Sequence, residues 1–160
     1  MDDLLNLLKQ NARFTNSQLA SMLGISESEV EAKIKEYEKN GTIMGYSVIL
    51  NEEKIPDSTV TAFIELRVTP KKDCGFDDLA KSIMLYDEVE SVTLMSGTYD
   101  LAVTVTGADF KTIALFVAKK LSTIEGVIST ATHFVLKRYK EKGTIIETDY
   151  SKDERGFISP

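Results

Sequence analysis

Several residue types that build common active sites are scarce in this chain of 160 residues. One cysteine, Cys74, excludes a disulfide within the chain and a cysteine-rich zinc site. One histidine, His133, excludes most histidine-based metal sites and catalytic triads. No apolar run reaches the ~18 residues that suggest a membrane-spanning helix. We therefore expect no metal ion, no cofactor and no membrane partner.

Positive charge is also in deficit. Lysine and arginine number 19 against 25 aspartates and glutamates, giving a formal charge of −6. This balance excludes a generally basic surface of the kind that binds nucleic acid without preference, although a local basic patch is compatible with it. Residues 1–5 are acidic where a secretory signal would be basic. We therefore expect no export signal and a reduced, cytoplasmic protein.

The first 45 residues carry the hydrophobic spacing and end signals of three helices. Thr15 and Gln18 have the spacing of a capping box, and Ser26 and Glu29 repeat it before a third helix. Gly24, between these two helices, suits a left-handed C-terminal cap. This pattern is typical of a helix-turn-helix, although a three-helix packing module shares it. The third helix is expected to bury Val30, Ile34 and Tyr37, and residues 42–46 to form a wing strand.

The rest of the chain predicts a second domain. Residues 60–68, 89–96, 99–106 and 127–137 read as strands, with helices over 76–83 and 110–126 and a tight connection at Gly97 and Thr98. This order is the ferredoxin-like βαββαβ arrangement, in which right-handed crossovers place both helices on one sheet face. The other face would carry Phe63, too apolar to remain wet, so we expect a dimer through that face. The fold class is α+β, with a winged helix-turn-helix at 1–47, a linker at 48–58, the ferredoxin-like domain at 59–140 and an extension at 141–160.

Motifs in both halves stand in a recognisable order. The N-terminal half has Leu19-Ala20, Leu23-Gly24-Ile25-Ser26, Lys33-Ile34, Asn40-Gly41-Thr42-Ile43 and Gly45-Tyr46; the C-terminal half has the runs 94–101, 124–127 and 130–138. Their order and separation resemble the leucine-responsive regulator (Lrp/AsnC) family, transcription factors that respond to amino acids. The resemblance implies double-stranded operator DNA and an amino-acid effector as partners, and an even-numbered, octamer-like homo-oligomer. The chain departs from the family pattern in its short N-terminus, in its long C-terminal tail, and in Tyr37, where leucine is usual.

The third helix is acidic for a helix that reads DNA. Between residues 26 and 40 it has five glutamates and three lysines, a net charge of −2. Three interpretations stay open. In the first, Glu29 and Glu31 support the helix by bonding to Ser26 and Lys35. In the second, Glu27 or Glu31 accepts a hydrogen bond from a cytosine amino group; in the third, DNA binding is lost and the protein is an oligomeric sensor or assembly protein. If DNA is bound, the expected contacts are Arg13, Asn16, Ser28, Lys33, Lys35 and Lys39, although each lysine can equally be a solvated surface charge.

The turn at residues 96–100 resembles the ligand-associated motif of the family. Gly97 allows backbone amides to approach a carboxylate, and Asp100 can pair with an α-ammonium group. By resemblance, an amino acid between neighbouring dimers would alter assembly. The alternative is a purely structural turn in which Asp100 bonds its own backbone. The expected effector-binding residues are Ser96, Gly97, Thr98, Tyr99, Asp100, Thr130 and Thr132.

An enzyme is the least favoured function class. Heme-handling decarboxylases share this general fold, but His133 has neither a second histidine nor clustered arginines beside it. We expect it to pack or to hydrogen-bond, and we assign no role to Cys74. The sequence therefore predicts a transcription regulator that is not an enzyme.

Overall fold

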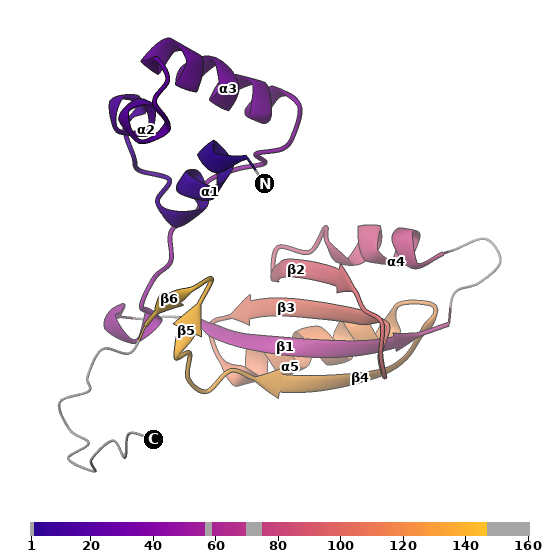
Figure 1. Ribbon diagram of the computed structural model, residues 1–160. Helices are drawn as coiled ribbons and strands as arrows, with labels where there is room; N and C mark the ends of the chain where they lie inside the picture. The colour runs from indigo at the N-terminus through magenta and orange to yellow at the C-terminus, as the bar shows by residue number, and fades with distance from the viewer. Residues whose placement is uncertain (1, 57–58, 70–74, 147–160) are drawn as a thin grey trace, which may run out of the picture. The chain divides into compact units, whose positions relative to one another are not determined.

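The computed structural model describes residues 2–56, 59–69 and 75–146. The chain divides into two compact units, Met1–Val48 and Ile49–Pro160. The first unit is helical, and the second is built around an antiparallel sheet (Figure 1). Within the described ranges, no helix is both long and apolar enough to cross a membrane.

The first unit contains three helices around a small core. They are α1 (Asp3–Gln10), α2 (Asn16–Leu23) and α3 (Glu27–Lys39). All three contribute a fully enclosed side chain: Leu4 from α1, Leu19 from α2 and Val30 from α3. Ile34 and Tyr37 pack against this cluster from α3, as their helical spacing predicts. The predicted helices and the inward face of the third are therefore confirmed.

The helix ends are set by local hydrogen bonds that the sequence anticipates. Thr15 caps α2 and forms a reciprocal capping box with Gln18, and Ser26 does the same for α3 with Glu29. Gly24 ends α2 with φ of 67°, a left-handed conformation that costs other residues about 1 kcal/mol or more. These signals together place α2 and α3 in the predicted helix-turn-helix.

The predicted wing strand at residues 42–46 is wrong. This segment is irregular and is tied to the end of α3 instead. The Ile43 amide donates to the Tyr37 carbonyl at 3.0 Å, and the Tyr46 hydroxyl donates to Glu38 at 3.0 Å. A strand needs a neighbouring strand for its backbone groups, and the described part of this unit offers none.

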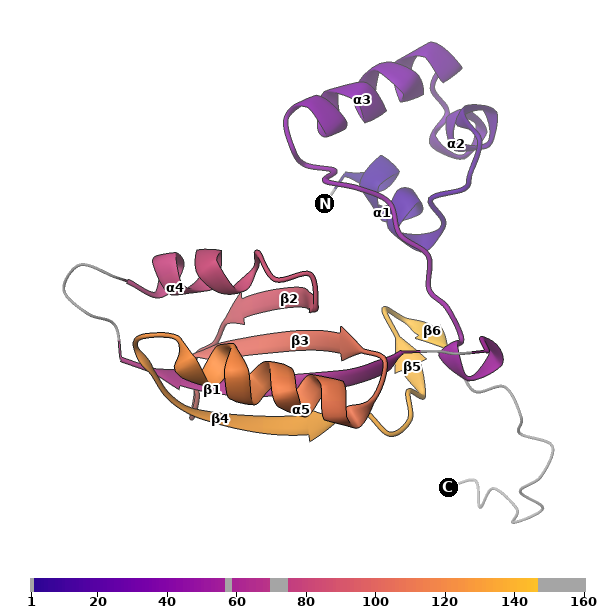
Figure 2. The same ribbon diagram turned by 180° about the vertical axis from the view of Figure 1, so that it is seen from behind.

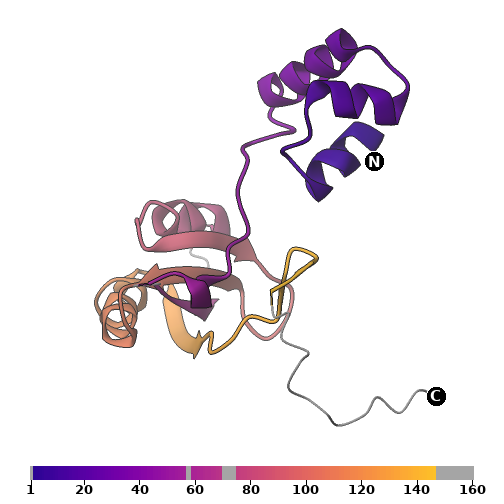
Figure 3. The same cartoon turned by 90° about the vertical axis from the view of Figure 1, so that its left-hand side faces the viewer.

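The second unit has the predicted βαββαβ order. Its strands are β1 (Val60–Val68), β2 (Val89–Leu94), β3 (Leu101–Gly107) and β4 (Val127–Phe134), arranged β2-β3-β1-β4 with every pair antiparallel. Helices α4 (Phe76–Ile83) and α5 (Phe110–Lys119) lie on the same face of this sheet (Figures 2 and 3). The core forms between that face and the helices, and its central residues are Ile64, Leu66, Ile83, Val103 and Ile113.

Several element boundaries differ from the prediction. α5 stops at Lys119, and a short 3₁₀ turn, η2 (Leu121–Thr123), follows instead of a continuous helix to Gly126. The Thr123 hydroxyl donates to the Lys119 and Lys120 carbonyls, which takes up carbonyls exposed by this break. The connection between β2 and β3 is a loop of residues 95–100 rather than a two-residue turn. A hydrogen bond from the Met95 amide to the Asp100 carbonyl closes this loop.

The region after β4 also departs from expectation. β4 ends at Phe134 rather than at residue 137, and a small hairpin of β5 (Lys140–Glu141) and β6 (Thr144–Ile145) follows. A second short turn, η1 (Glu52–Lys54), precedes β1. The final residues of the tail and Cys74 lie outside the described residues.

Candidate functional site

The outward face of α3 carries part of the expected DNA-contact set. Because Val30, Ile34 and Tyr37 face the core, helical spacing places Ser28, Lys35 and Lys39 on the opposite, exposed face. The structure therefore brings these three side chains to one surface.

Lys33 does not share this surface. It lies on the flank of α3 near the start of α1, where its charge acts on Asp2. The Asp2 carboxylate accepts the Leu4 amide at 2.8 Å, and this bond, followed by the Tyr37 hydroxyl and Lys33, lowers the pKa of Asp2. Lys33 thus faces a carboxylate that caps a helix.

Arg13 and Asn16 occupy the connection from α1 to α2. The Arg13 amide donates to Asn11 Oδ1 at 2.9 Å, which stabilises the turn, and the Arg13 side chain remains exposed. Asn16 is the first residue of α2 and is half-buried. An exposed cation beside a helix N-terminus is a favourable arrangement for a phosphate.

Two of the α3 glutamates are engaged inside the helix. Glu29 Oε2 accepts the Ser26 amide at 2.8 Å and the Ser26 hydroxyl at 2.7 Å, and the bond from the hydroxyl is the main reason that the pKa of Glu29 is lowered. Glu31 accepts a hydrogen bond from Lys35, which lowers the pKa of Glu31 and raises that of Lys35. Both contacts agree with the interpretation that these glutamates support the helix.

The Asp100 side chain is bonded to β1 rather than to its own loop. Its Oδ2 accepts the Val68 amide at 2.8 Å, and its own amide donates to the Leu66 carbonyl at 2.9 Å. The Val68 amide needs this acceptor because the pairing of β1 with β4 shifts register between Arg67 and Val68. No local sequence signal points to Val68 as the partner, since the two residues are 32 positions apart.

The expected effector residues do not converge within one chain. The Tyr99 ring packs edge-on against Phe63 with centroids 6.1 Å apart, on the sheet face that the helices leave uncovered. Thr130 and Thr132 lie opposite Leu66 and Ile64 in the register, so their side chains project from the helix-covered face. Ser96, Gly97 and Thr98 are exposed in the loop between these two sides.

The uncovered sheet face holds the lone histidine. His133 Nε2 lies 3.4 Å from Glu65 Oε1, and the ring lies 6.2 Å from that of Phe63. Among the residues that the structure describes, no cluster of histidine, cysteine and carboxylate side chains could hold a metal ion. The contacts of His133 are those of a packing and hydrogen-bonding residue.

Comparison with known proteins agrees with this architecture. Residues 3–44 match the family model of a winged helix-turn-helix DNA-binding domain, and residues 61–145 match that of the Lrp/AsnC ligand binding domain. An uncharacterised HTH-type transcriptional regulator of Bacillus subtilis, YugG, is 43% identical over 99% of this chain and 95% of its own length. The leucine-responsive regulatory protein of Haemophilus influenzae is 27% identical over 89% of this chain and 86% of its own.

A solved structure extends the comparison to three dimensions. A transcriptional regulator of Neisseria meningitidis, determined in complex with L-methionine, superposes with a TM-score of 0.70 at 28% identity, covering 86% of this chain and 88% of its own. These comparisons support a regulator and not an enzyme, and they give no support to an assembly protein without DNA binding. The chain belongs to the Lrp/AsnC family of helix-turn-helix transcriptional regulators.

Proposed function

We propose that this regulator acts in the cytoplasm and reads its operator with the outward face of α3. Ser28 and Lys39 would contact DNA from that face, with Lys35 held back by Glu31, while Arg13 and Asn16 would contact phosphates. The carrying observation is that three glutamates of α3 are held by hydrogen bonds from residues of the same helical unit, which agrees with a role in supporting the helix. Glu29, Glu31 and Glu38 accept hydrogen bonds from Ser26, Lys35 and Tyr46 respectively.

A salt titration tests this proposal. Binding of the full chain to DNA upstream of its own gene is followed by fluorescence anisotropy at increasing salt. Lys39→Gln should reduce the slope of log K against log salt by about 1, because one phosphate contact is lost. Lys9→Gln, an exposed lysine on α1, is the matched control and should leave the slope unchanged. A wild-type affinity that does not respond to salt would overturn the phosphate contacts.

We also propose an amino-acid site shared between copies of the chain. Residues 96–99 lie in an exposed loop, whereas Thr130 and Thr132 project from the helix-covered face, so a ligand that uses both sets needs two chains. The regulator of Neisseria meningitidis was solved with L-methionine, which makes this amino acid the first probe. Calorimetry and light scattering with L-methionine should show binding together with a change in oligomer mass. Binding of L-methionine that is unchanged in a monomeric variant would exclude a shared site.

The uncovered sheet face is the proposed dimer surface. Phe63, Glu65, Arg67 and His133 lie on it, and the helices of the same chain leave it uncovered. An aromatic residue at the centre of a polar face is typical of a protein interface. A higher even-numbered, octamer-like assembly would follow from further contacts between such dimers.

A further inference from the structure

The most basic stretch of the chain lies in the second unit, directly after β4. Residues 137–142 contain four cations and one carboxylate, Glu141, a net charge of +3. No other window of six residues in the sequence contains four cations. The chain as a whole carries a formal charge of −6, and α3 is itself acidic. The strongest local concentration of positive charge therefore lies outside the helix-turn-helix.

Backbone hydrogen bonds hold this stretch as a hairpin. β5 and β6 pair with each other in an antiparallel ladder, and the Ile146 amide donates to the Tyr139 carbonyl at 3.0 Å at the base of the ladder. Lys142 and Gly143 form the turn between the two strands. We call residues 137–146 the basic hairpin. Its cations are thus presented by an ordered turn and its flanking strands.

Lys142 has an unusual backbone conformation at the tip of the basic hairpin. Its φ is 44°, and that of Gly143 is 89°. Two-residue turns with positive φ at both positions favour asparagine, aspartate and glycine. Within the described ranges, Lys142 is the one residue other than glycine that has a positive φ. Turn preference does not account for a lysine here, whereas a contact of its ammonium group with an external partner does.

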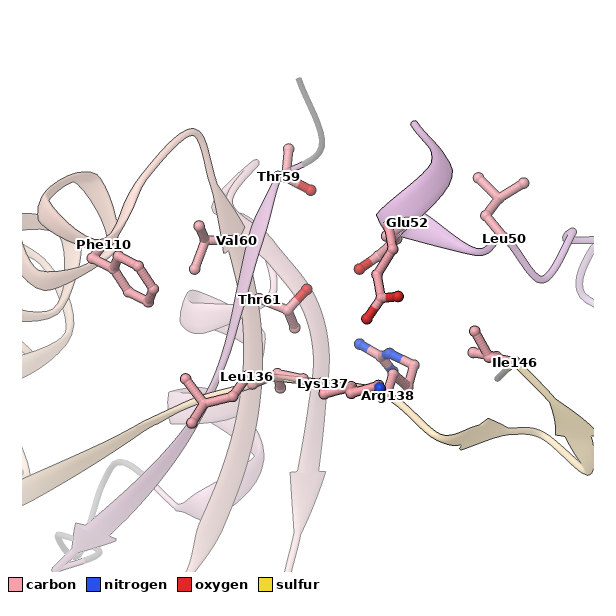
Figure 4. A pocket seen from close by; sticks show the side chains of 12 residues that line it. Leu50, Glu52, Thr59, Val60, Thr61, Phe110, Leu136, Lys137, Arg138 and Ile146 are labelled. Carbon is pink, nitrogen blue, oxygen red and sulfur yellow. The ribbon is translucent and has the colours of Figure 1, made fainter. Parts of the chain in front are cut away.

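Two of the four cations are engaged within the second unit. Arg138 Nη1 donates to Glu141 at 2.6 Å, so the one carboxylate of the stretch is paired. Arg138 also lines an open pocket at the start of β1, where Figure 4 shows its side chain pointing toward Glu52. Lys137 Nζ lies 5.1 Å from the centroid of the Tyr139 ring, a cation–π contact. These two cations mainly stabilise the hairpin itself.

The other two cations, Lys140 and Lys142, point to a partner outside the chain. Both residues are exposed, and neither ammonium group has a hydrogen-bond or ion-pair partner among the residues that the structure describes. No enclosed polar site surrounds them that would select a small anion. A DNA backbone instead presents a row of phosphates to exposed lysines and releases counterions when they bind.

Chain connectivity keeps the basic hairpin close to the DNA-binding unit. The first unit ends at Val48, and three residues later the Asn51 side-chain amide donates to the Ile146 carbonyl at 3.5 Å. Three residues span at most about 11 Å. The base of the hairpin is therefore tied to the segment by which the chain leaves the helix-turn-helix, and so lies near DNA that this unit holds.

We propose that Lys140 and Lys142 contact the phosphate backbone of the DNA that the helix-turn-helix holds. The basic hairpin is then a second DNA-contact surface, and it supplies positive charge that α3 lacks. Phosphate contacts carry no sequence information, so the hairpin strengthens binding to operator and to unrelated DNA alike. This inference rests on the DNA binding proposed above, although it does not depend on which α3 residues read the bases.

Lys142→Asn is the sharpest test, because it removes the charge and suits the turn. Binding of the full chain is followed by fluorescence anisotropy at increasing salt, with the duplex upstream of its own gene and an unrelated duplex of equal length. K142N should reduce the slope of log K against log salt by about 1 with both duplexes, and K140Q/K142N by about 2. The melting temperature of K142N should equal or exceed that of the wild type, so weaker binding cannot be ascribed to unfolding.

Lys119→Gln is the matched control. Lys119 is an exposed lysine at the end of α5, and its loss removes the same charge from the second unit. Both slopes should stay unchanged in this variant. An equal reduction in K119Q and K142N would overturn the hairpin contact, because overall charge would then account for the effect.

The remaining outcomes separate this proposal from the one on α3. A reduced slope in Lys39→Gln with unchanged slopes in K140Q/K142N would overturn the hairpin contact and leave the α3 contacts intact. The reverse result would support the hairpin and contradict the α3 contact. Unchanged slopes together with an altered oligomer mass of K140Q/K142N, measured by light scattering without DNA, would show that the hairpin contacts another copy of the chain instead. Failure of the wild type to bind either duplex would overturn both proposals.

Discussion

The Asp100 carboxylate accepts a 2.8 Å hydrogen bond from the Val68 amide and so connects the β2–β3 loop to the end of β1. A second bond, from the Asp100 amide to the Leu66 carbonyl, fixes the same junction. The carboxylate thereby supports the irregular end of β1, where pairing with β4 shifts register. If the Asp100 carboxylate also pairs with the ammonium group of an amino-acid effector, it must do so while it accepts the Val68 amide.

Substitution of Asp100 separates these two roles. Asp100→Ala should lower the free energy of unfolding by about 1–3 kcal/mol, because the Val68 amide loses its acceptor in a partly buried position. Asp100→Asn keeps an acceptor oxygen and should cost less, while removing the negative charge. Urea denaturation measures stability, and calorimetry with L-methionine measures binding. If D100N binds L-methionine as tightly as the wild type, Asp100 does not pair with the ligand ammonium.

Glu31→Gln should strengthen operator binding. The change removes a negative charge from α3 and releases Lys35 from its ion pair, so the salt slope should steepen by up to about 1. Helix stability should fall only slightly, because the pair is exposed to solvent. Fluorescence anisotropy at several salt concentrations measures this effect. Glu53→Gln, in the second unit, is the control for net charge, and an equal gain there would show that Glu31 acts only through overall charge.

Ser26→Ala should weaken the start of α3. The Ser26 hydroxyl accepts the Glu29 amide at 3.3 Å and donates to the Glu29 carboxylate, and loss of an N-cap side chain costs about 1 kcal/mol. Thermal unfolding followed by circular dichroism measures the loss. Ser21→Ala, at an exposed position inside α2, should leave stability unchanged or raise it slightly, because alanine favours helix interiors. Equal melting temperatures in the two variants would contradict a capping role for Ser26.

The stability of the helical unit should depend on pH at both extremes. The pKa of Asp2 is lowered from 3.8, chiefly by the Leu4 amide, so its contribution is present above that value and is lost as pH falls through the lowered pKa. Burial and then Asp2 raise the pKa of Tyr37 from 10.0, so its contribution is present below pH 10 and is lost as pH rises through the raised pKa.

Tyr37→Phe tests the alkaline limb. The variant should lose less stability than the wild type above pH 10, as measured by thermal unfolding of the full chain across the pH range. Tyr46→Phe is an informative companion, because burial and its bond to Glu38 also raise the pKa of Tyr46. Identical alkaline profiles for Y37F and the wild type would show that Tyr37 ionises without affecting folding.

Phe63→Lys should dissociate the proposed dimer. A lysine at the centre of the uncovered sheet face would bury a charge in the interface, while the helix-covered core would stay intact. Light scattering coupled to size exclusion should give the mass of a single chain, which is half that of the dimer. Thr144→Lys, in the hairpin after β4, is an exposed control that should keep the wild-type mass. An unchanged mass for F63K would exclude this face as the dimer surface.

Much of the helical unit was predictable because its determinants are local. Thr15 with Gln18, Ser26 with Glu29, and Gly24 each act within one helical turn, so their spacing is sufficient to place the helix ends. The Glu31–Lys35 pair follows from the same periodicity. The strand order of the second unit was predictable for a related reason, since alternating apolar residues and right-handed crossovers restrict the arrangement.

Tertiary structure decided the features that depend on residues far apart in the chain. The irregular course of residues 42–46 depends on whether a strand partner is present, and the acceptor for the Val68 amide comes from Asp100 across the sheet. Register places Thr130 and Thr132 on the helix-covered face, whereas Tyr99 packs against Phe63 on the uncovered face. The pocket at the start of β1 is lined by Glu52, Thr61 and Arg138, which come from three separate segments of the chain. Local spacing in the sequence does not predict contacts between residues that are far apart in the chain, because only the packed sheet brings these segments within contact distance.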